Sequence, residues 1–322
     1  MIRALFFRTE KSSRRADDKR KSGVWNVRNL EMKTQSEKPA VNPYLVIAFG
    51  VFSVSTSAVL VKLAEAPAGV IAFYRLFFSV LLMLPVVLTR NLKDIGGFSL
   101  NDLFLSAVSG IFLAFHFILW FESLNYTSVA SSTVLVTLQP LFSFAGTYLL
   151  YKERINFRTI VSGLIAIFGS ILISWGDFNI SREALFGDVL ALIACALITG
   201  YLLFGQSVRK RVSLFPYTFV VYSISSVTLW IYVWANGQSF YPYRPQDWIY
   251  FLLLAVFPTL LGHTLFNWSL KWVSTNVISM AILFEPVGAA LLAFFILEET
   301  LKWTQIIGGL IVLSGLFLFS KK

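Results

Sequence analysis

Long apolar runs constrain the fold of this chain more than any other feature. From residue 43 to residue 320 the sequence alternates between extended apolar stretches and short links that are rich in Pro, Gly and charged residues. A helix of about 20 apolar residues crosses the ~30 Å hydrocarbon core of a bilayer. Only 14% of the residues are charged and 57% are apolar, whereas soluble domains are about a quarter charged. The sequence therefore predicts an all-α integral membrane protein.

We predict ten transmembrane helices, and no link between them is long enough to fold as a separate domain. The N-terminal segment, residues 1–42, is polar and basic, and we predict that it is a disordered cytoplasmic tail. An alternative interpretation is that translation starts at Met32. The predicted spans are residues 43–63, 68–90, 101–121, 126–150, 156–175, 185–206, 215–235, 247–270, 275–297 and 303–320.

The basic residues predict the orientation of the spans, because Lys and Arg are retained on the cytoplasmic side. With the N-terminus inside, 22 of the 27 Lys and Arg fall in the tail or in inner links, four fall in outer links, and Arg75 lies within a span. We therefore expect a multi-pass protein of the cytoplasmic (inner) membrane with both termini in the cytoplasm. The same distribution explains the net charge of +10 without a nucleic-acid partner.

The second half of the chain repeats the first at an offset of 146 residues. Between residues 120–174 and 266–320 there are 12 identities in 55 positions, most of them at Gly, Pro, Ser and Glu. Because each repeat has an odd number of spans, the second copy must be inverted relative to the first. We predict two inverted five-helix repeats, residues 43–175 and 185–320. Inverted repeats around a midplane site are typical of secondary transporters, which alternate access by rocking one repeat against the other.

Short motifs in both repeats resemble one known family. The run Leu283–Gly288 is followed by Leu297-Glu298-Glu299 and by a Gly-rich last span, and the first repeat contains Tyr74-Arg75 and Leu138-Gln139-Pro140. These residues resemble the EamA-like branch of the drug/metabolite transporter superfamily over roughly residues 43 to 320. The resemblance implies a ten-helix, inverted-repeat carrier that exports amino acids or related metabolites by alternating access.

Two charged residues lie within predicted spans, where ionisable groups are costly and are candidates for function. Arg75 and Glu285 both break the repeat, since Arg75 matches Ser223 and Glu285 matches Gln139, whereas Tyr74 matches Tyr222. One interpretation is that the two charges neutralise each other as a structural ion pair. The other is that they bind opposite ends of a zwitterionic solute. The candidate site residues at these positions are Tyr74, Arg75, Gln139 and Glu285.

The two histidines of the chain, His116 and His263, occupy matching places in the third and eighth spans. We expect both to face a common central cavity, where they could relay protons or bond a polar substrate; the alternative is a hydrogen bond to a neighbouring helix. Trp120 shares a helical face with His116, and Asn267 shares one with His263. Together with Trp268 they complete the candidates for substrate binding or proton coupling.

The sequence argues against an enzyme. Two histidines and the single Cys195 cannot build a di-metal centre, and no Gly-rich phosphate loop is present to bind ATP. We expect no metal and no cofactor; the expected partners are a small-molecule substrate and the lipid bilayer. Small residues indicate close helix packing, within the chain or at the face of a homodimer; these are Gly163, Gly169, Gly309 and Gly315.

We interpret the chain as a secondary transporter that exports a small polar metabolite, an amino acid or a related compound. An organellar exchanger of nucleotide sugars or other metabolites is an alternative; nucleotide sugars would need more basic residues in the cavity than Arg75. A membrane enzyme or a sensor is an alternative of another class, but no cluster of catalytic side chains at one depth supports it.

Overall fold

The computed structural model describes residues 39–127, 129–175, 181–298 and 302–320. The regular elements in these ranges are helices, and residues 43–322 form one unit that is separate from residues 1–42. The predicted disorder of the N-terminal tail concerns residues that are mostly outside the described ranges. The elements are α3 (Pro43–Leu63), α4 (Ala68–Val86), η2 (Val87–Asn91), α5 (Leu92–Gly96), α6 (Leu100–Ser123), α7 (Val129–Thr137), α8 (Gln139–Tyr151), α9 (Phe157–Ser174), α10 (Arg182–Arg209), α11 (Leu214–Ala235), α12 (Pro245–Leu254), η4 (Ala255–His263), α13 (Thr264–Ser269), α14 (Thr275–Ile282), α15 (Glu285–Ile296) and α16 (Trp303–Ser320).

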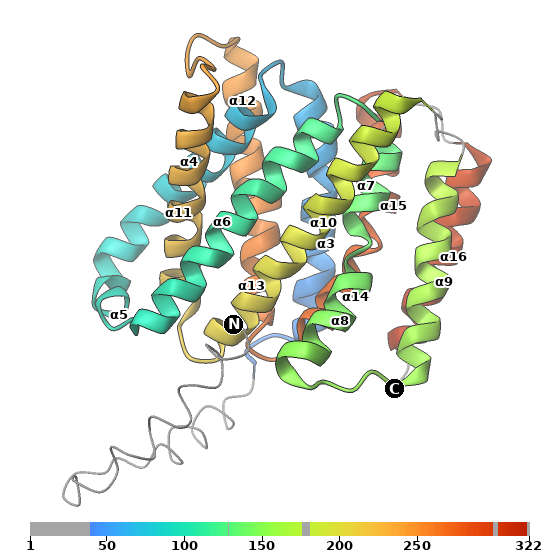
Figure 1. Cartoon of the computed structure of the whole chain (residues 1–322), viewed down its shortest axis with the longest axis horizontal. Coiled ribbons are helices and arrows are strands. Elements are labelled where there is room, and N and C mark those ends of the chain that lie inside the picture. Colours follow the sequence, from blue (N-terminus) through green and yellow to red (C-terminus); the bar gives the residue numbers. More distant parts are fainter. Residues whose placement is uncertain (1–38, 128, 176–180, 299–301, 321–322) are drawn as a thin grey trace, which may run out of the picture. The chain divides into compact units, whose positions relative to one another are not determined.

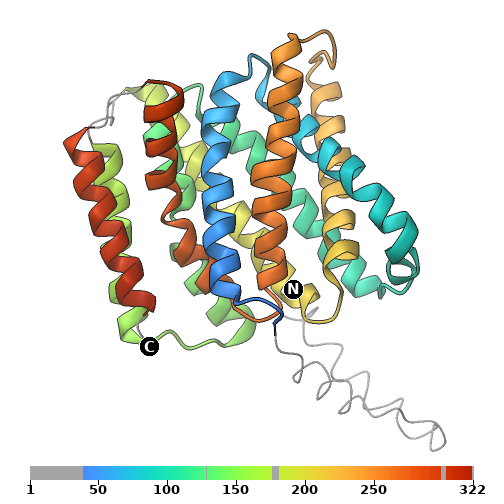
Figure 2. The ribbon, with the colours of Figure 1, turned by 180° about the vertical axis from the view of Figure 1, so that it is seen from behind.

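These elements make ten apolar crossings, as the sequence predicts. Among the described residues, nine helical segments are long and apolar enough to span a membrane, and the tenth is the shorter apolar helix Phe157–Ile173 within α9. In residues 43–322 the start of α3 and the end of α16 lie at the same end of the helical bundle, the lower end in Figures 1 and 2. An even number of crossings requires this arrangement.

The fourth and ninth crossings are each broken in the middle, although the sequence predicted continuous spans there. The breaks separate α7 from α8 and α14 from α15. Each second half-helix begins with a proline at its second position, Pro140 in α8 and Pro286 in α15. Proline is accepted in the first turn of a helix, because the missing N–H has no partner there, but it disrupts a helix interior. The matched prolines of the two repeats therefore explain both breaks.

Two further prolines coincide with π-helical segments, which are common at functional sites. Pro85 lies near the end of α4, directly before η2, and Pro258 lies within η4. The helical path of the second crossing continues through η2 and α5 to Gly96, beyond the predicted end at residue 90. In η4 the proline changes the local hydrogen bonding, and this change shapes the site described below.

Helices α9 and α16 pack closely against each other through glycines. A Cβ on Gly169 would lie 2.7 Å from the Gly308 carbonyl oxygen, and a Cβ on Gly315 would lie 2.8 Å from the Ala166 nitrogen. Figures 1 and 2 show these two helices side by side at one edge of the unit. The small-residue faces of Gly169 and Gly315, which the sequence also offered as a dimer face, are thus occupied within the chain.

Candidate functional site

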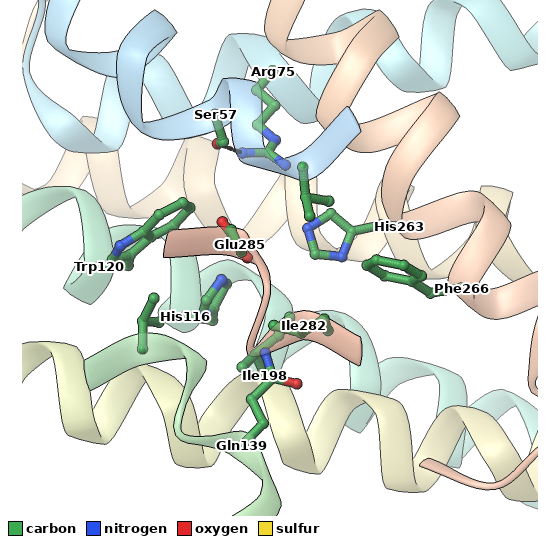
Figure 3. Close-up of a pocket in the computed structure, with 12 residues that line it drawn as sticks. Ser57, Arg75, His116, Trp120, Gln139, Ile198, His263, Phe266, Ile282 and Glu285 are labelled. Carbon is green, nitrogen blue, oxygen red and sulfur yellow. Dashed lines mark hydrogen bonds between the residues drawn. The ribbon is translucent and has the colours of Figure 1, made fainter. Parts of the chain in front are cut away.

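A buried cavity lies where the two broken crossings meet the first, second, third, sixth and eighth crossings. Its volume is about 20 Å³, which is room for roughly one water molecule. Figure 3 shows the side chains of Arg75, Glu285, His116 and His263 directed toward one another across it. The lining residues are Val54, Ser57, Arg75, His116, Trp120, Val136, Gln139, Ile198, His263, Phe266, Ile282 and Glu285. Both repeats therefore contribute to one enclosed site.

Arg75 is fully buried, and neutral groups hold its guanidinium. Its Nε donates to Thr259 Oγ1 at 2.7 Å, and its Nη1 donates to Ser57 Oγ at 2.8 Å. The guanidinium carbon lies 4.1 Å from the centre of the Phe117 ring, a cation–π geometry that stabilises a desolvated cation. In the described residues no carboxylate oxygen comes within 4.0 Å of it. The cation is thus oriented but not neutralised by a direct ion pair.

Pro258 explains why Thr259 can accept from Arg75. A proline has no N–H to donate to the carbonyl four residues earlier, here that of Leu254. The Thr259 hydroxyl donates to the Leu254 carbonyl at 2.9 Å instead. Since its only proton is used in this way, its oxygen lone pairs face Arg75 as acceptors. The π-helical segment therefore provides the hydrogen-bond acceptor that holds the Arg75 guanidinium.

This arrangement predicts the effect of changing Thr259. Thr259→Val keeps the shape of the side chain but leaves Arg75 Nε without its buried acceptor, and such a loss costs about 1–3 kcal/mol. We expect the melting temperature in detergent to fall by several degrees. The matched control is Thr259→Ser, which keeps the hydroxyl and should melt close to the wild type. Equal melting of the Val and Ser variants would contradict this role.

Glu285 is the first residue of α15, and its side chain is 7% exposed. Among the described residues its carboxylate makes no hydrogen bond and no ion pair within 4.0 Å. The N-terminus of a helix carries a partial positive charge that stabilises a carboxylate. Gln139 has the same place at the start of α8, and its Oε1 is buried with no hydrogen-bond partner in the part of the chain that the structure describes. The two half-helices thus direct matching N-termini and matching side chains at the cavity.

The structure places both histidines in the wall of this cavity, as their matching positions predict. His116 Nδ1 lies 3.0 Å from the Ala194 carbonyl oxygen. Because a carbonyl can only accept, this nitrogen carries the proton, and Nε2 of the neutral ring is an acceptor. His263 Nδ1 has no hydrogen-bond partner among the described residues. His116 therefore has a structural bond as well as a free polar edge, whereas His263 keeps its Nδ1 unpaired.

Trp120 completes the polar rim of the cavity. Its ring stacks on His116 with centroids 5.7 Å apart, and its buried Nε1 has no partner in the described protein. Most buried polar atoms in proteins are hydrogen-bonded. Three unpartnered atoms around one cavity, Trp120 Nε1, Gln139 Oε1 and His263 Nδ1, are an arrangement suited to a polar ligand.

Three of the nine predicted residues do not line the cavity. Tyr74 points away from the cavity, and its hydroxyl donates to the Phe240 carbonyl at 2.7 Å. Asn267 is buried and donates to the His263 carbonyl and to the Tyr201 hydroxyl. Trp268 packs against Trp272 with centroids 4.2 Å apart. The other six, Arg75, His116, Trp120, Gln139, His263 and Glu285, line it.

A second polar cluster ties the repeats together at the end of the unit where α8 and α10 finish. The Glu153 carboxylate accepts from Gln206 Nε2 at 3.0 Å and from Asn276 Nδ2 at 3.3 Å. Gln206 Oε1 in turn accepts from the backbone N–H of Thr275 at 2.6 Å, and Asn276 Nδ2 also donates to Thr147 Oγ1 at 2.8 Å. Glu153 therefore connects the link after α8 to both α10 and α14. The sequence predicted no role for this cluster.

The described residues contain no group of three or more His, Cys, Asp or Glu side chains that could hold a metal ion. The cavity is instead a set of one cation, one carboxylate, neutral polar groups and apolar walls. Such a set can bind a small charged or polar molecule through ionic and hydrogen bonds.

One family model matches both halves of the chain, and several transporters are similar to it in sequence. The family model described as the EamA-like transporter family matches the chain twice, over residues 42–175 and 185–321. An uncharacterized transporter of Archaeoglobus fulgidus is 25% identical over 248 residues, which cover 77% of this chain and 85% of the relative. The riboflavin transporter ImpX of Fusobacterium nucleatum is 21% identical over 203 residues, 61% of this chain and 68% of that protein. One crystal structure, 15% identical, superposes with a TM-score of 0.70 over 86% of this chain and 96% of that chain, and so shares the fold.

Proposed function

Because this chain belongs to the EamA-like transporter family, we propose that it is a secondary transporter that exports a small zwitterionic metabolite, an amino acid or a close relative, across the cytoplasmic membrane. The single observation that carries this proposal is the pair of opposite charges in one buried cavity that do not pair with each other. Arg75 and Glu285 both line the cavity, and neither has an ionic partner within 4.0 Å among the described residues.

A zwitterion satisfies both charges at once. A buried, unpaired charge is strongly unfavourable, whereas charge-assisted hydrogen bonds to an ionised partner are among the strongest that a protein makes. In the proposed complex the substrate carboxylate binds Arg75 and the ammonium group binds Glu285. Trp120, Gln139 and His263 offer further hydrogen bonds through atoms that have no partner among the described residues. A nucleotide sugar, with two phosphates, would be served poorly by a single arginine.

The small volume of the cavity supports alternating access. About 20 Å³ is too little for an amino acid, so binding requires the lining helices to separate. The lining comes from both repeats, and relative movement of inverted repeats would open the cavity to one side at a time. The breaks in the fourth and ninth crossings, beside Gln139 and Glu285, are points at which these crossings could bend during such a movement.

Transport by the purified protein tests the proposal. The full chain would be reconstituted into liposomes that are loaded with single amino acids, and efflux would be measured with and without a pH gradient, since the histidines are candidates for proton coupling. We expect saturable efflux of some amino acids, competed by their zwitterionic analogues and not by the matching amines or carboxylic acids alone. Equal competition by the amine or the acid would contradict a site for a zwitterion.

The proposed orientation has its own test. We expect the link that contains Arg154 to face the cytoplasm and the link that contains Glu298 to face outward, because most basic residues fall on the side of Arg154. Single cysteines at these two positions, in a Cys195→Ser background, would be exposed to an impermeant maleimide on intact cells. Labelling at position 298 and protection at 154 is the expected result. The reverse pattern would contradict the orientation, and labelling at both positions would contradict the opposite placement of the two links.

A further inference from the structure

A groove distinct from the central cavity lies on the outer surface of the unit, at the end of α8. Its volume is about 530 Å³, and its walls come from α8 and from the link to α9. The Tyr148 ring is 55% exposed there. In Figure 1 this link crosses the lower end between α8 and α9, the end at which the chain begins α3 and finishes α16. The lining residues are Phe144, Ala145, Tyr148, Glu153, Arg154 and Ile155.

Two cations border this groove without anionic partners. The Lys152 ammonium lies 5.4 Å from the centre of the Tyr148 ring, and Arg154 is part of the wall. In the described residues neither has a carboxylate oxygen within 4.0 Å. Lys152 has a left-handed backbone with φ of 59°, which ends α8 and turns the chain across the groove. The groove is therefore apolar along α8 and positively charged at its rim.

The one acidic residue of the groove is already engaged. Both carboxylate oxygens of Glu153 accept hydrogen bonds from the amide groups of Gln206 and Asn276, which belong to α10 and α14. These bonds hold the carboxylate toward the interior of the unit. Lys152 and Arg154 therefore make the rim of the groove positively charged.

We propose that this groove binds one phospholipid with an anionic headgroup, from the leaflet on the side where α8 ends. The phosphate would lie between Lys152 and Arg154, and an acyl chain would run along Phe144, Ala145 and Tyr148. Three general observations support this occupant. Basic residues just cytoplasmic of a transmembrane helix attract anionic headgroups, aromatic rings favour the headgroup level, and the charge bias predicts that this end is the cytoplasmic one. The proposal does not rest on the identity of the transported substrate.

The test is lipid retention by the purified full chain, measured by native mass spectrometry and by melting temperature in detergent. The probes are dioleoyl phosphatidylglycerol, dioleoyl phosphatidylcholine and soluble glycerol 3-phosphate. The variant is Lys152→Gln with Arg154→Gln. The matched control is Arg90→Gln with Lys93→Gln, which removes the same charge at the same end from residues that are exposed and away from the groove. All four side chains are exposed, so both variants are expected to fold.

We expect the wild type and the control to retain one phosphatidylglycerol molecule in preference to phosphatidylcholine. The groove variant should bind phosphatidylglycerol about 30-fold more weakly, since each basic residue near a headgroup contributes about fivefold in affinity. Equal retention of the two lipids, or equal loss in the control and groove variants, would overturn the proposal. Protection by glycerol 3-phosphate alone would also overturn it, because it would indicate a site for a soluble phosphate. Should the groove variant melt lower without lipid, Arg154→Gln alone would be compared in the same way.

Discussion

Arg75→Gln and Glu285→Gln are each expected to lower amino-acid efflux by about 10- to 100-fold while the protein stays folded. A hydrogen bond to a charged group contributes about 1.5–3 kcal/mol, and each 1.4 kcal/mol is about tenfold. Gln at position 75 can still bond to Ser57 or Thr259, and Gln at position 285 is the residue that the first repeat has at its matching position 139. Because the two charges form no direct ion pair, removing one does not leave a former partner stranded.

The double variant separates the two interpretations of these charges. If they bind opposite ends of one substrate, the double variant should be as inactive as either single variant. If they act only by neutralising each other over a longer distance, each single variant should be expressed at a lower level and melt at a lower temperature. The double variant should then regain the wild-type expression level and melting temperature. Recovery of folding and transport together would contradict the binding role. Tyr74→Phe is the control, since Tyr74 is next to Arg75 in sequence but bonds to Phe240 outside the cavity.

Gly308→Leu is expected to destabilise the protein by about 3 kcal/mol or more. A Cβ on Gly308 would lie 2.6 Å from the Gly169 carbonyl oxygen and 2.8 Å from the Ile173 nitrogen. These are backbone atoms of α9, so the two helices must separate to admit any side chain. In membranes, close helix packing through small residues is a principal source of association. The melting temperature in detergent, with the yield of monodisperse protein, measures the effect.

The adjacent glycine provides a matched comparison. A Cβ on Gly309 would meet only the Val287 side chain, at 3.5 Å, which is ordinary contact. Gly308→Ala and Gly309→Ala gain the same helix propensity, about 1 kcal/mol. We therefore expect Gly309→Ala to melt at or above the wild-type temperature and Gly308→Ala to melt below it. Equal melting of the two would show that α9 and α16 do not pack as closely as described.

The spans and the repeat could be predicted from the sequence because their signals are local and periodic. Apolar length fixes where a helix can cross a bilayer, and identity at Pro140 and Pro286 fixes the alignment of the repeats. Arg75 and Glu285 could be chosen as candidate site residues from the sequence for a similar reason, since each is a charged residue within an apolar run. The expectation that the two histidines face one cavity came from the repeat, because they occupy matching positions in its two copies.

The remainder depends on side-chain direction and on non-local contacts. Tyr74 and Arg75 are neighbours in sequence, but successive helical residues point about 100° apart, so only one can face the cavity. The hydrogen bond between the Arg75 guanidinium and Thr259 depends on a π-helical segment that is about 180 residues further along the sequence. The Pro-Thr pair at 258–259 inside a predicted span was the available signal. The cluster around Glu153 gave no signal, because its members are ordinary polar residues until the fold brings them together.

The inverted repeats share a topology, but the hydrogen-bonding side chains around Glu153 are not all repeated at the matching places in the other copy. Glu153 ties the link after α8 to α10 and α14, and the cluster residues Thr147 and Asn276 match Ala293 and Ala130 in the other repeat, where an alanine side chain has no hydrogen-bonding group. If the protein works by alternating access as proposed, opening toward the Glu153 end would break these hydrogen bonds and so carry a free-energy cost before any substrate binds. We therefore expect that open state to be sparsely populated in the empty protein. A substrate that enters from that end can raise this population only by its differential affinity for the two states.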